Sequence, residues 1–521
     1  MSSNSVLHPP SPLPPLLIRA DSTPQIGTGH IMRCIALAQA WQDEGGKVVF
    51  LSHCESDALR ERIVKEGFKF VPIDHPHPHP SDLSQTLMQL QSFLPSPSSF
   101  SPSVPWLILD GYHFTPEYQK AIKDAGIRLL VIDDMNHLPY YHADIILNQN
   151  IHATELKYNC DPDTKLLLGP KYVLLRREFL KYKDFKREIP DKARKILVTM
   201  GGADPDNVTL KVIQALNLLG DPELEVKVVI GPSNPHIDSL REAVLHSPFS
   251  VLLLHAVDNM ADLMAWADVA ITAGGSTCWE LAYMGVPMIA LILAENQHPV
   301  VTMLDKLSIA IGLEEHNALS SSAIFNSLPN LLLNFKKRLY MKERANEIVD
   351  GEGCDRVILN VTGKKIRLRL ATYKDMRIIW KWANDPDTRK SAFNTDPIPW
   401  DTHKKWFEEK LENYDSFIYV GLDGNDTPIG QIRFDFNKQN EALIDVNIDK
   451  LFRGRGYGTE LIILGTEKLS KEKGNLKIYA YVKTFNEASI KAFEKAGFKR
   501  EGYETICSQP AVRLLKEMRH E

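Results

Sequence analysis

Four short segments that follow predicted strands carry residues suited to binding an anionic ligand. They are GTGH at 27–30, MGGAD at 200–204, AGGS at 273–276 and ENQ at 295–297. Glycine lets the backbone approach a ligand closely, and the start of a following helix offers free N–H groups to phosphate oxygens. We therefore expect a phosphate-binding cleft lined by Gly27, Gly29, Gly201, Gly202, Gly274, Gly275, Ser276 and Gln297. Each segment alone is also compatible with a tight turn that binds nothing.

Two side chains add reactive groups to this expected cleft. His30 ends the first segment, beside any bound diphosphate, and an imidazole can act as a general base at neutral pH. Glu280 follows Ser276 by about one helical turn, where a carboxylate can accept hydrogen bonds from both ribose hydroxyls. The alternatives are a surface histidine at a helix-capping turn and a solvated glutamate.

Another candidate anion site lies near the C-terminus of the sequence. The segment 449–459, DKLFRGRGYGT, follows a predicted strand and begins a predicted helix. Backbone amides of such a turn can hold a pyrophosphate, and arginines add positive charge. The residues of this turn are Arg453, Gly454, Arg455, Gly456, Tyr457, Gly458 and Thr459. A further strand-to-helix start occurs at Asn486.

The elements that must position these residues form three series. Apolar runs at 16–21, 47–52 and 69–73 alternate with helical patterns, which predicts a parallel sheet covered by helices. The segment 74–105 interrupts this series with HPHPHP and a Pro/Ser-rich run around an expected helix near 83–94. Proline at every second residue disfavours helix and sheet, so we expect a solvated loop here rather than a metal site of the three histidines.

The strand pattern resumes after this insertion and then begins a second time. A charged stretch at 181–194 predicts a linker to the second series. The expected strands of both series end at 112, 134, 150, 202, 231, 256, 275 and 292. In open parallel sheets the ligand binds at the carboxyl ends of the strands, which is where the four segments lie.

The third series begins near residue 364 and differs in pattern. We expect a strand at 366–371, helices at 375–384 and 400–413, and three antiparallel strands between 417 and 449. The domain prediction is therefore a loose tail at 1–15, lobes at 16–180 and 195–347, and a last domain at 364–521. The fold class is α/β, with two Rossmann-like lobes followed by a third α/β domain.

Composition excludes several classes of function. The chain has 61 basic and 66 acidic residues and a net charge of −5, so no global field favours nucleic acid or an anionic membrane. Its six cysteines show no CxxC spacing, which favours a reduced cytoplasm over disulfides or a zinc site. The first residues lack the pattern of a signal peptide, and no apolar run is long enough to span a membrane. We expect a soluble, cytoplasmic protein.

The N-terminal motifs resemble those of a known enzyme family. RADSTPQIGTGHIMRCIALA, LDGY, VIDD, LNQN, MGGAD, GGSTCWELAYMGVP and AENQ are similar, in this order, to the nucleotide-sugar hydrolases of pseudaminic acid biosynthesis. That family has the two-lobed GT-B fold and cleaves UDP from UDP-2,4-diacetamido-2,4,6-trideoxy-β-L-altropyranose. The resemblance covers about residues 16–345, and the insertion at 74–105 interrupts none of the motifs.

The resemblance implies roles for individual residues. His30 would be the general base that activates water, Asp110 and Tyr112 would match the family's Asp-x-Tyr, and Asn296 its ENQ asparagine. Ser276 and Glu280 would hold phosphate and ribose, by similarity to UDP-binding transferases. UDP is a stable leaving group, so hydrolysis needs only one base and hydrogen-bond donors that stabilise the negative charge of the released UDP. Hydrolysis would invert the configuration at the anomeric carbon. No Asp/Glu cluster demands a metal, so we expect metal independence.

The C-terminal motifs resemble the GNAT acetyltransferases over about residues 364–510. The R-x-x-G-x-G turn at Arg453 implies that acetyl-CoA binds through its pyrophosphate, with Asn486 on the pantetheine arm. Many members have a tyrosine general acid where this chain has Phe493, so the thiolate would leave unassisted or with other help. Asp445 is our candidate base for the amine, with Asn447 and His403 as alternatives; each could equally be an ordinary polar residue.

The two resemblances together predict a bifunctional enzyme. The last domain would acetylate a UDP-4-amino-sugar, and the first two lobes would hydrolyse the product. One alternative is a GT-B glycosyltransferase; the 74–105 insertion lacks the basic residues that a lipid-docking face needs, which disfavours it. Another is a protein acetyltransferase with a non-catalytic nucleotide-sugar sensor. The expected partners are the UDP-sugar, acetyl-CoA and other pathway enzymes.

Overall fold

The structure is a computed structural model of the chain. It describes residues 13–23, 25–93, 104–255, 257–315, 320–438 and 440–519. Most of the expected N-terminal tail, and the Pro/Ser-rich end of the 74–105 insertion, lie outside the described residues. The chain forms two compact units, Met1–Ile358 and Leu359–Glu521, which are described separately below.

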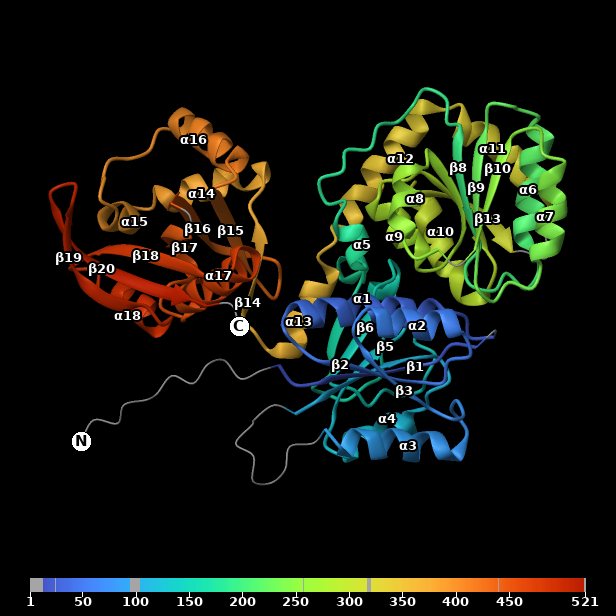
Figure 1. Ribbon diagram of the computed structural model, residues 1–521, viewed down its shortest axis with the longest axis horizontal. Coiled ribbons are helices and arrows are strands. Elements are labelled where there is room, and N and C mark those ends of the chain that lie inside the picture. Colours follow the sequence, from blue (N-terminus) through green and yellow to red (C-terminus); the bar gives the residue numbers. More distant parts are fainter. Residues whose placement is uncertain are drawn as a thin grey trace. The chain divides into compact units, whose positions relative to one another are not determined.

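The first unit contains two parallel sheets (Figure 1). Their strand orders correspond over six strands, and the first sheet has a seventh at its edge. The first runs β3-β2-β1-β4-β5-β6-β7 and the second β10-β9-β8-β11-β12-β13. All pairings in both sheets are parallel. The order 3-2-1-4-5-6 is that of the Rossmann fold, so the predicted fold class is confirmed for both lobes.

The strands of the first sheet are β1 (Leu16–Ala20), β2 (Val48–Ser52), β3 (Lys69–Pro72), β4 (Trp106–Asp110), β5 (Arg128–Ile132), β6 (Ile145–Asn148) and β7 (Lys165–Leu168). Those of the second are β8 (Lys195–Thr199), β9 (Glu225–Ile230), β10 (Ser250–His255), β11 (Val269–Ala273), β12 (Met288–Ile292) and β13 (Ala310–Glu315). Every predicted strand is present, whereas β7 and β13 were missed. Central strands such as β1 and β12 are buried throughout, because helices cover both faces of the sheets.

Helices connect these strands. In the first lobe they are α1 (Gly29–Asp43), α2 (Asp57–Lys65), α3 (Pro80–Gln91), α4 (Pro116–Asp124) and α5 (Arg177–Leu180). In the second they are α6 (Val208–Leu219), α7 (Ile237–Leu245), α8 (Met260–Trp266), α9 (Thr277–Tyr283), α10 (His298–Lys306), α11 (Ser321–Leu332) and α12 (Phe335–Ile348). Helix α13 (Gly353–Thr362), which was not predicted, begins on the first lobe, where Arg356 donates to the carbonyl of Lys171.

The histidine–proline segment packs on the first lobe, so the solvated-loop prediction is wrong for part of it. His77 stacks on Phe114, with ring centroids 5.9 Å apart. Helix α3 is close to the predicted one and buries Asp82 completely, where Arg19 of β1 donates to it at 2.6 Å. This buried ion pair and the stacked ring hold the segment against the sheet. His75 and His79 are exposed, as expected.

The charged linker at 181–194 also has a structural role that its composition does not indicate. Arg187 is buried and donates to the carbonyls of Met264, Ala267 and Met284 in the second lobe. Burial lowers the pKa of Arg187 to about 10. The linker is therefore fixed to the second lobe by main-chain acceptors.

The second unit is a mixed sheet of order β14-β15-β16-β17-β18-β20-β19. Its strands are β14 (Ile366–Leu370), β15 (Ser416–Asp423), β16 (Pro428–Lys438), β17 (Glu441–Ile448), β18 (Leu476–Lys483), β19 (Lys499–Ile506) and β20 (Gln509–Met518). Its helices are α14 (Met376–Ala383), α15 (Pro386–Ser391), α16 (Trp400–Glu412), α17 (Tyr457–Lys473) and α18 (Glu487–Lys495). The predicted antiparallel order of β15, β16 and β17 is confirmed.

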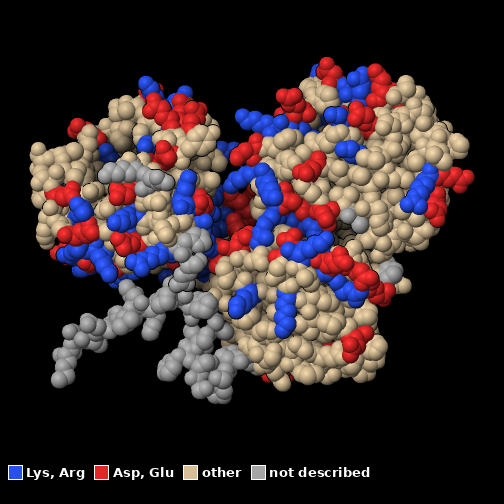
Figure 2. Space-filling model, viewed as in Figure 1, with Lys and Arg blue, Asp and Glu red and all other residues tan. Residues whose placement is uncertain are grey.

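On the face shown in Figure 2, acidic and basic side chains are interspersed in both units. No helix among the described residues is long and apolar enough to cross a membrane.

Candidate active sites

A cavity of about 420 Å³ lies between the two lobes of the first unit, at the carboxyl ends of their strands. The eight residues predicted to bind phosphate all line it, together with His30, Tyr112, Glu280 and Asn296. The structure therefore brings together segments that lie up to about half the chain apart. A Cβ atom on Gly274 would lie 2.3 Å from Val301 Cγ2, so the turn before α9 requires glycine there.

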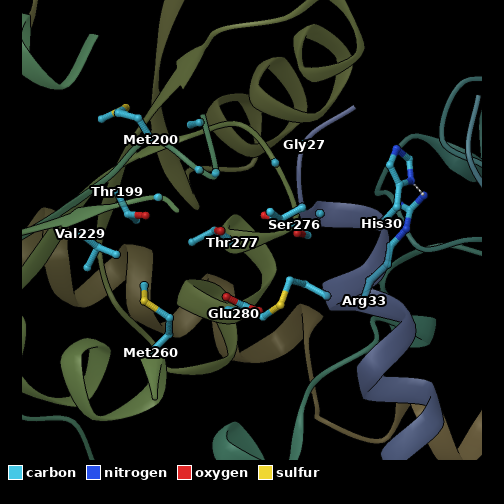
Figure 3. Close-up of a pocket in the computed structure, with 18 of the residues that line it drawn as sticks. Gly27, His30, Arg33, Thr199, Met200, Val229, Met260, Ser276, Thr277 and Glu280 are labelled. Atoms are coloured by element: carbon cyan, nitrogen blue, oxygen red, sulfur yellow. Dashed lines mark hydrogen bonds between the residues drawn. The ribbon is translucent and has the colours of Figure 1, made fainter. Parts of the chain in front are cut away.

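His30 lies in the first turn of α1 and pairs with a buried carboxylate. Its Nδ1 is 2.6 Å from Asp110 Oδ1, at the end of β4. Arg33, one turn later on α1, donates from Nε to Asp110 Oδ2 at 2.6 Å. Figure 3 shows Arg33 beside His30, with its Nη2 3.3 Å from His30 Nδ1. Burial acts to raise the pKa of Asp110, but the charges of Arg33 and His30 hold it well below its ordinary value. An ionised carboxylate at Nδ1 favours the tautomer in which Nε2 is free to accept a proton.

A hydrogen-bonded chain continues from Arg33 across the cavity. Arg33 Nη1 lies 2.8 Å from Asp134 Oδ2, and the Tyr112 hydroxyl donates to the same oxygen at 2.6 Å. Asn296 of the second lobe donates to the Tyr112 hydroxyl at 3.1 Å. Burial and the charge of Asp134 raise the pKa of Tyr112, so its hydroxyl stays protonated. This series of hydrogen bonds connects His30 on the first lobe with Asn296 on the second.

Glu280 lies on α9 and lines the same cavity, apart from His30 in Figure 3. Its Oε1 is 2.8 Å from Arg176 Nη1. Burial raises the pKa of Glu280, and the positive charge of Arg176 acts against that rise. Glu178 in turn binds Arg176 at 3.0 Å and Arg62 of α2 at 2.7 Å.

The glycine-rich turn of the second unit precedes α17, the 17-residue helix Tyr457–Lys473. Gly454 and Gly456 have φ of 77° and 86°, a left-handed backbone that glycine adopts without strain. The Arg453 guanidinium pairs with Asp385 at 2.7 Å and Asp387 at 3.2 Å. Its charge therefore anchors the turn, and the free amides at the start of α17 remain the candidate anion ligands.

Strands β17 and β18 pair in parallel only from Glu441 to Leu443. Beyond this point Asp445 accepts a hydrogen bond from Gln431 at 2.9 Å and from Asn447 at 3.4 Å. Asn486 caps α18 by accepting from the Ser489 amide at 3.2 Å.

Two other C-terminal candidates are core residues. His403 is 2% exposed and binds the Met376 carbonyl at 3.0 Å, so it is poorly placed to act as a base. Burial lowers the pKa of His403. Phe493 is buried against Phe498, with centroids 5.0 Å apart.

Comparisons with known proteins agree with this division. Residues 195–352 match the model of the glycosyltransferase family 28 C-terminal domain, and residues 365–499 match that of the acetyltransferase (GNAT) domain. The chain therefore carries a segment similar to the family 28 C-terminal domain, followed by one similar to the GNAT domain. The predicted fusion is thereby confirmed at the level of its domains.

Three relatives extend the comparison beyond the family 28 domain. The uncharacterized protein MJ1062 of Methanocaldococcus jannaschii is 25% identical over 506 residues, 93% of this chain and 96% of its own. The spore coat polysaccharide biosynthesis protein SpsG of Bacillus subtilis is 23% identical, over 65% of this chain and 95% of its own. The UDP-2,4-diacetamido-2,4,6-trideoxy-beta-L-altropyranose hydrolase of Campylobacter jejuni is 28% identical, over 56% of this chain and 96% of its own. The hydrolase relative and the GNAT match support an enzyme, and the GNAT match supports the use of acetyl-CoA.

Sequence reasoning missed three cavity residues that the structure adds to the first site. Arg33 could have been found from its position one helical turn after His30, and Asp134 from its place at the end of a predicted strand. Arg176 gave no signal, because the two adjacent arginines of the LLRREF segment resemble many surface arginines. Among the described residues, no group of three or more His, Cys, Asp or Glu side chains is placed to hold a metal ion.

Proposed function

We propose that the chain is a bifunctional nucleotide-sugar enzyme of pseudaminic acid biosynthesis. The first unit hydrolyses UDP-2,4-diacetamido-2,4,6-trideoxy-β-L-altropyranose, the substrate in the name of the Campylobacter relative. The GNAT domain acetylates the 4-amino group of its precursor with acetyl-CoA. The observation that carries the hydrolase proposal is the buried His30–Asp110 pair, 2.6 Å apart, at the cavity between the two lobes.

The hydrolytic step needs one base and stabilisation of the leaving group. His30 Nε2 takes a proton from water, the water oxygen bonds to the anomeric carbon, and the bond from that carbon to UDP breaks. Attack from the face opposite UDP inverts the anomeric carbon. Asp110 stabilises the imidazolium, as in other His–Asp pairs, and the amides near Gly275 and Ser276 stabilise the released diphosphate. No step requires a metal ion.

The acetyl transfer completes the substrate for hydrolysis. The amide groups of the Arg453–Thr459 turn bind the acetyl-CoA pyrophosphate, and Asp445 accepts the proton of the amine. The amine nitrogen bonds to the acetyl carbon, the thioester bond breaks, and the CoA thiolate leaves. Phe493 cannot protonate the CoA thiolate. A thiol of ordinary acidity can leave as the thiolate without protonation by a general acid.

The test is phosphorus NMR of the full chain with UDP-4-amino-4,6-dideoxy-N-acetyl-β-L-altrosamine in EDTA, with and without acetyl-CoA. We expect UDP to appear only when acetyl-CoA is present. Release of CoA without release of UDP would refute the proposed hydrolase activity and favour transfer of the sugar to an acceptor other than water. If neither product forms, the substrate assignment fails.

A further inference from the structure

Arg176 is a buried residue of the cavity that the proposed chemistry does not use. It is 4% exposed and lies directly before α5, in the segment that leads from the first sheet to the second. Its Nη1 is 2.8 Å from Glu280 Oε1, and its Nη2 donates to Glu178 Oε1 at 3.0 Å. Its guanidinium carbon lies 5.1 Å from the Phe179 ring centroid. Two carboxylates and an aromatic ring thus fix its orientation.

This arrangement fixes one oxygen of Glu280 and leaves the other available. Among the described residues, no side chain or amide donates to Glu280 Oε2, and Glu280 lines the cavity. A carboxylate that is held at one oxygen by a planar guanidinium loses its rotational freedom. The remaining lone pairs then have a set direction toward the ligand.

We propose that Arg176 is a positioning residue that orients Glu280 toward the ligand ribose and so sets the preference for ribonucleotides over 2′-deoxyribonucleotides. The inference rests on the proposed binding of a uridine nucleotide in this cavity. A ribose diol donates two hydrogen bonds to a well-placed carboxylate, and a 2′-deoxyribose donates one fewer. Without Arg176, Glu280 would lie buried beside Glu178 with less opposing charge and would rotate.

The test is calorimetric titration of the full chain with UDP and with 2′-deoxy-UDP. A hydrogen bond to a charged group corresponds to roughly a 10- to 100-fold preference for UDP in the unaltered protein. We expect Arg176→Met to reduce the preference for UDP to about threefold or less, with little change in the affinity for 2′-deoxy-UDP. Glu280→Gln should reduce the preference to the same extent. Arg176→Lys should retain part of it, because the positive charge remains.

Arg177→Met is the matched control, since its guanidinium pairs with Asp43 and it does not line the cavity. It should keep the full preference. The inference is wrong if Arg176→Met and Arg176→Lys discriminate as well as the unaltered protein, or if Arg176→Met weakens both ligands equally. Melting temperatures of all variants identify a folding defect, and the lysine variant keeps the test valid if the methionine variant unfolds.

The same titration separates this inference from the proposed hydrolase. If the unaltered chain prefers UDP and Arg176→Met does not, but no UDP is released from the sugar substrate, the inference stands and the hydrolase fails. If UDP is released but both nucleotides bind equally, the inference fails alone. If neither nucleotide binds, both fail.

Discussion

The two candidate sites of this chain are built in different ways. The candidate site of the first unit consists of side chains that come from both lobes, such as His30, Asp110 and Glu280, and each is held by a neighbour. The candidate site of the second unit rests on one continuous turn, Arg453–Thr459, whose backbone we propose to bind the ligand. The first therefore depends on the assembly of two lobes, whereas the second is encoded almost entirely in a local segment. Substitutions in the two units should separate the two activities.

The largest expected effect is the loss of hydrolysis in His30→Ala. Removal of a general base lowers the rate by about 10²- to 10⁴-fold. Phosphorus NMR should show little UDP release, while CoA release continues at the normal rate. His298→Ala is the control, because His298 is exposed at the start of α10. UDP release at the normal rate by His30→Ala would remove His30 from the role of base.

A second substitution should remove the other activity. Gly456→Asp places a side chain at a left-handed position and a negative charge beside the expected pyrophosphate, so we expect acetyl-CoA affinity to fall about 100-fold. Calorimetry measures the affinity, and UDP release from the diacetamido substrate should not change. Gly474→Asp, at the other end of α17 and also at positive φ, serves as the control. Unchanged acetyl-CoA affinity in Gly456→Asp would contradict the pyrophosphate assignment.

A smaller effect is expected at the link between the lobes. Tyr112→Phe removes the hydroxyl that donates to Asp134 and accepts from Asn296. The loss of these bonds should lower kcat/KM of hydrolysis about tenfold, without an effect on acetyl transfer. Tyr140→Phe also loses a hydroxyl bonded to an aspartate, Asp161, but does not line the cavity, and should behave as the unaltered enzyme. Equal rates in the two variants would show that the Tyr112 hydroxyl is dispensable.

The smallest effect concerns stability in acid. The pKa of Asp110 lies well below its ordinary value, and that of Asp21 is about 2. Both carboxylates therefore stabilise the folded state at pH values above the unfolded pKa of ~3.9. This stabilisation is lost as the pH falls from about 5 toward 2. Asp110→Asn should lower the urea midpoint of unfolding at pH 7, and this midpoint should then decrease less steeply as the pH falls. Asp124→Asn, at an exposed position, should change neither the midpoint nor its pH dependence. An Asp110→Asn variant whose midpoint decreases with pH as steeply as that of the unaltered chain would contradict the assignment.

Sequence patterns predicted much of the fold and of the lining of the first cavity. Alternating apolar runs located the central strands, and glycine-rich turns located segments that line the cavity, because both signals are local. The pattern failed at β7 and β13, which are edge strands of short or mixed character. It also failed to predict the burial of Asp82 and Arg187. Charged residues usually lie on the surface, but hydrogen-bond partners in the interior stabilise these two.

What the sequence by itself determined is the type of most elements and the approximate residues at their ends, since turn and helix-start preferences depend on neighbouring residues. The family resemblance, carried by the order of the motifs, implied the role of general base for His30. Only the tertiary structure decided which charges meet, as when Arg33 joins Asp110 to Asp134 and Arg176 faces Glu280. Those pairs depend on how strands far apart in the chain align in two sheets. A buried charge is stable only where such an alignment supplies its partner.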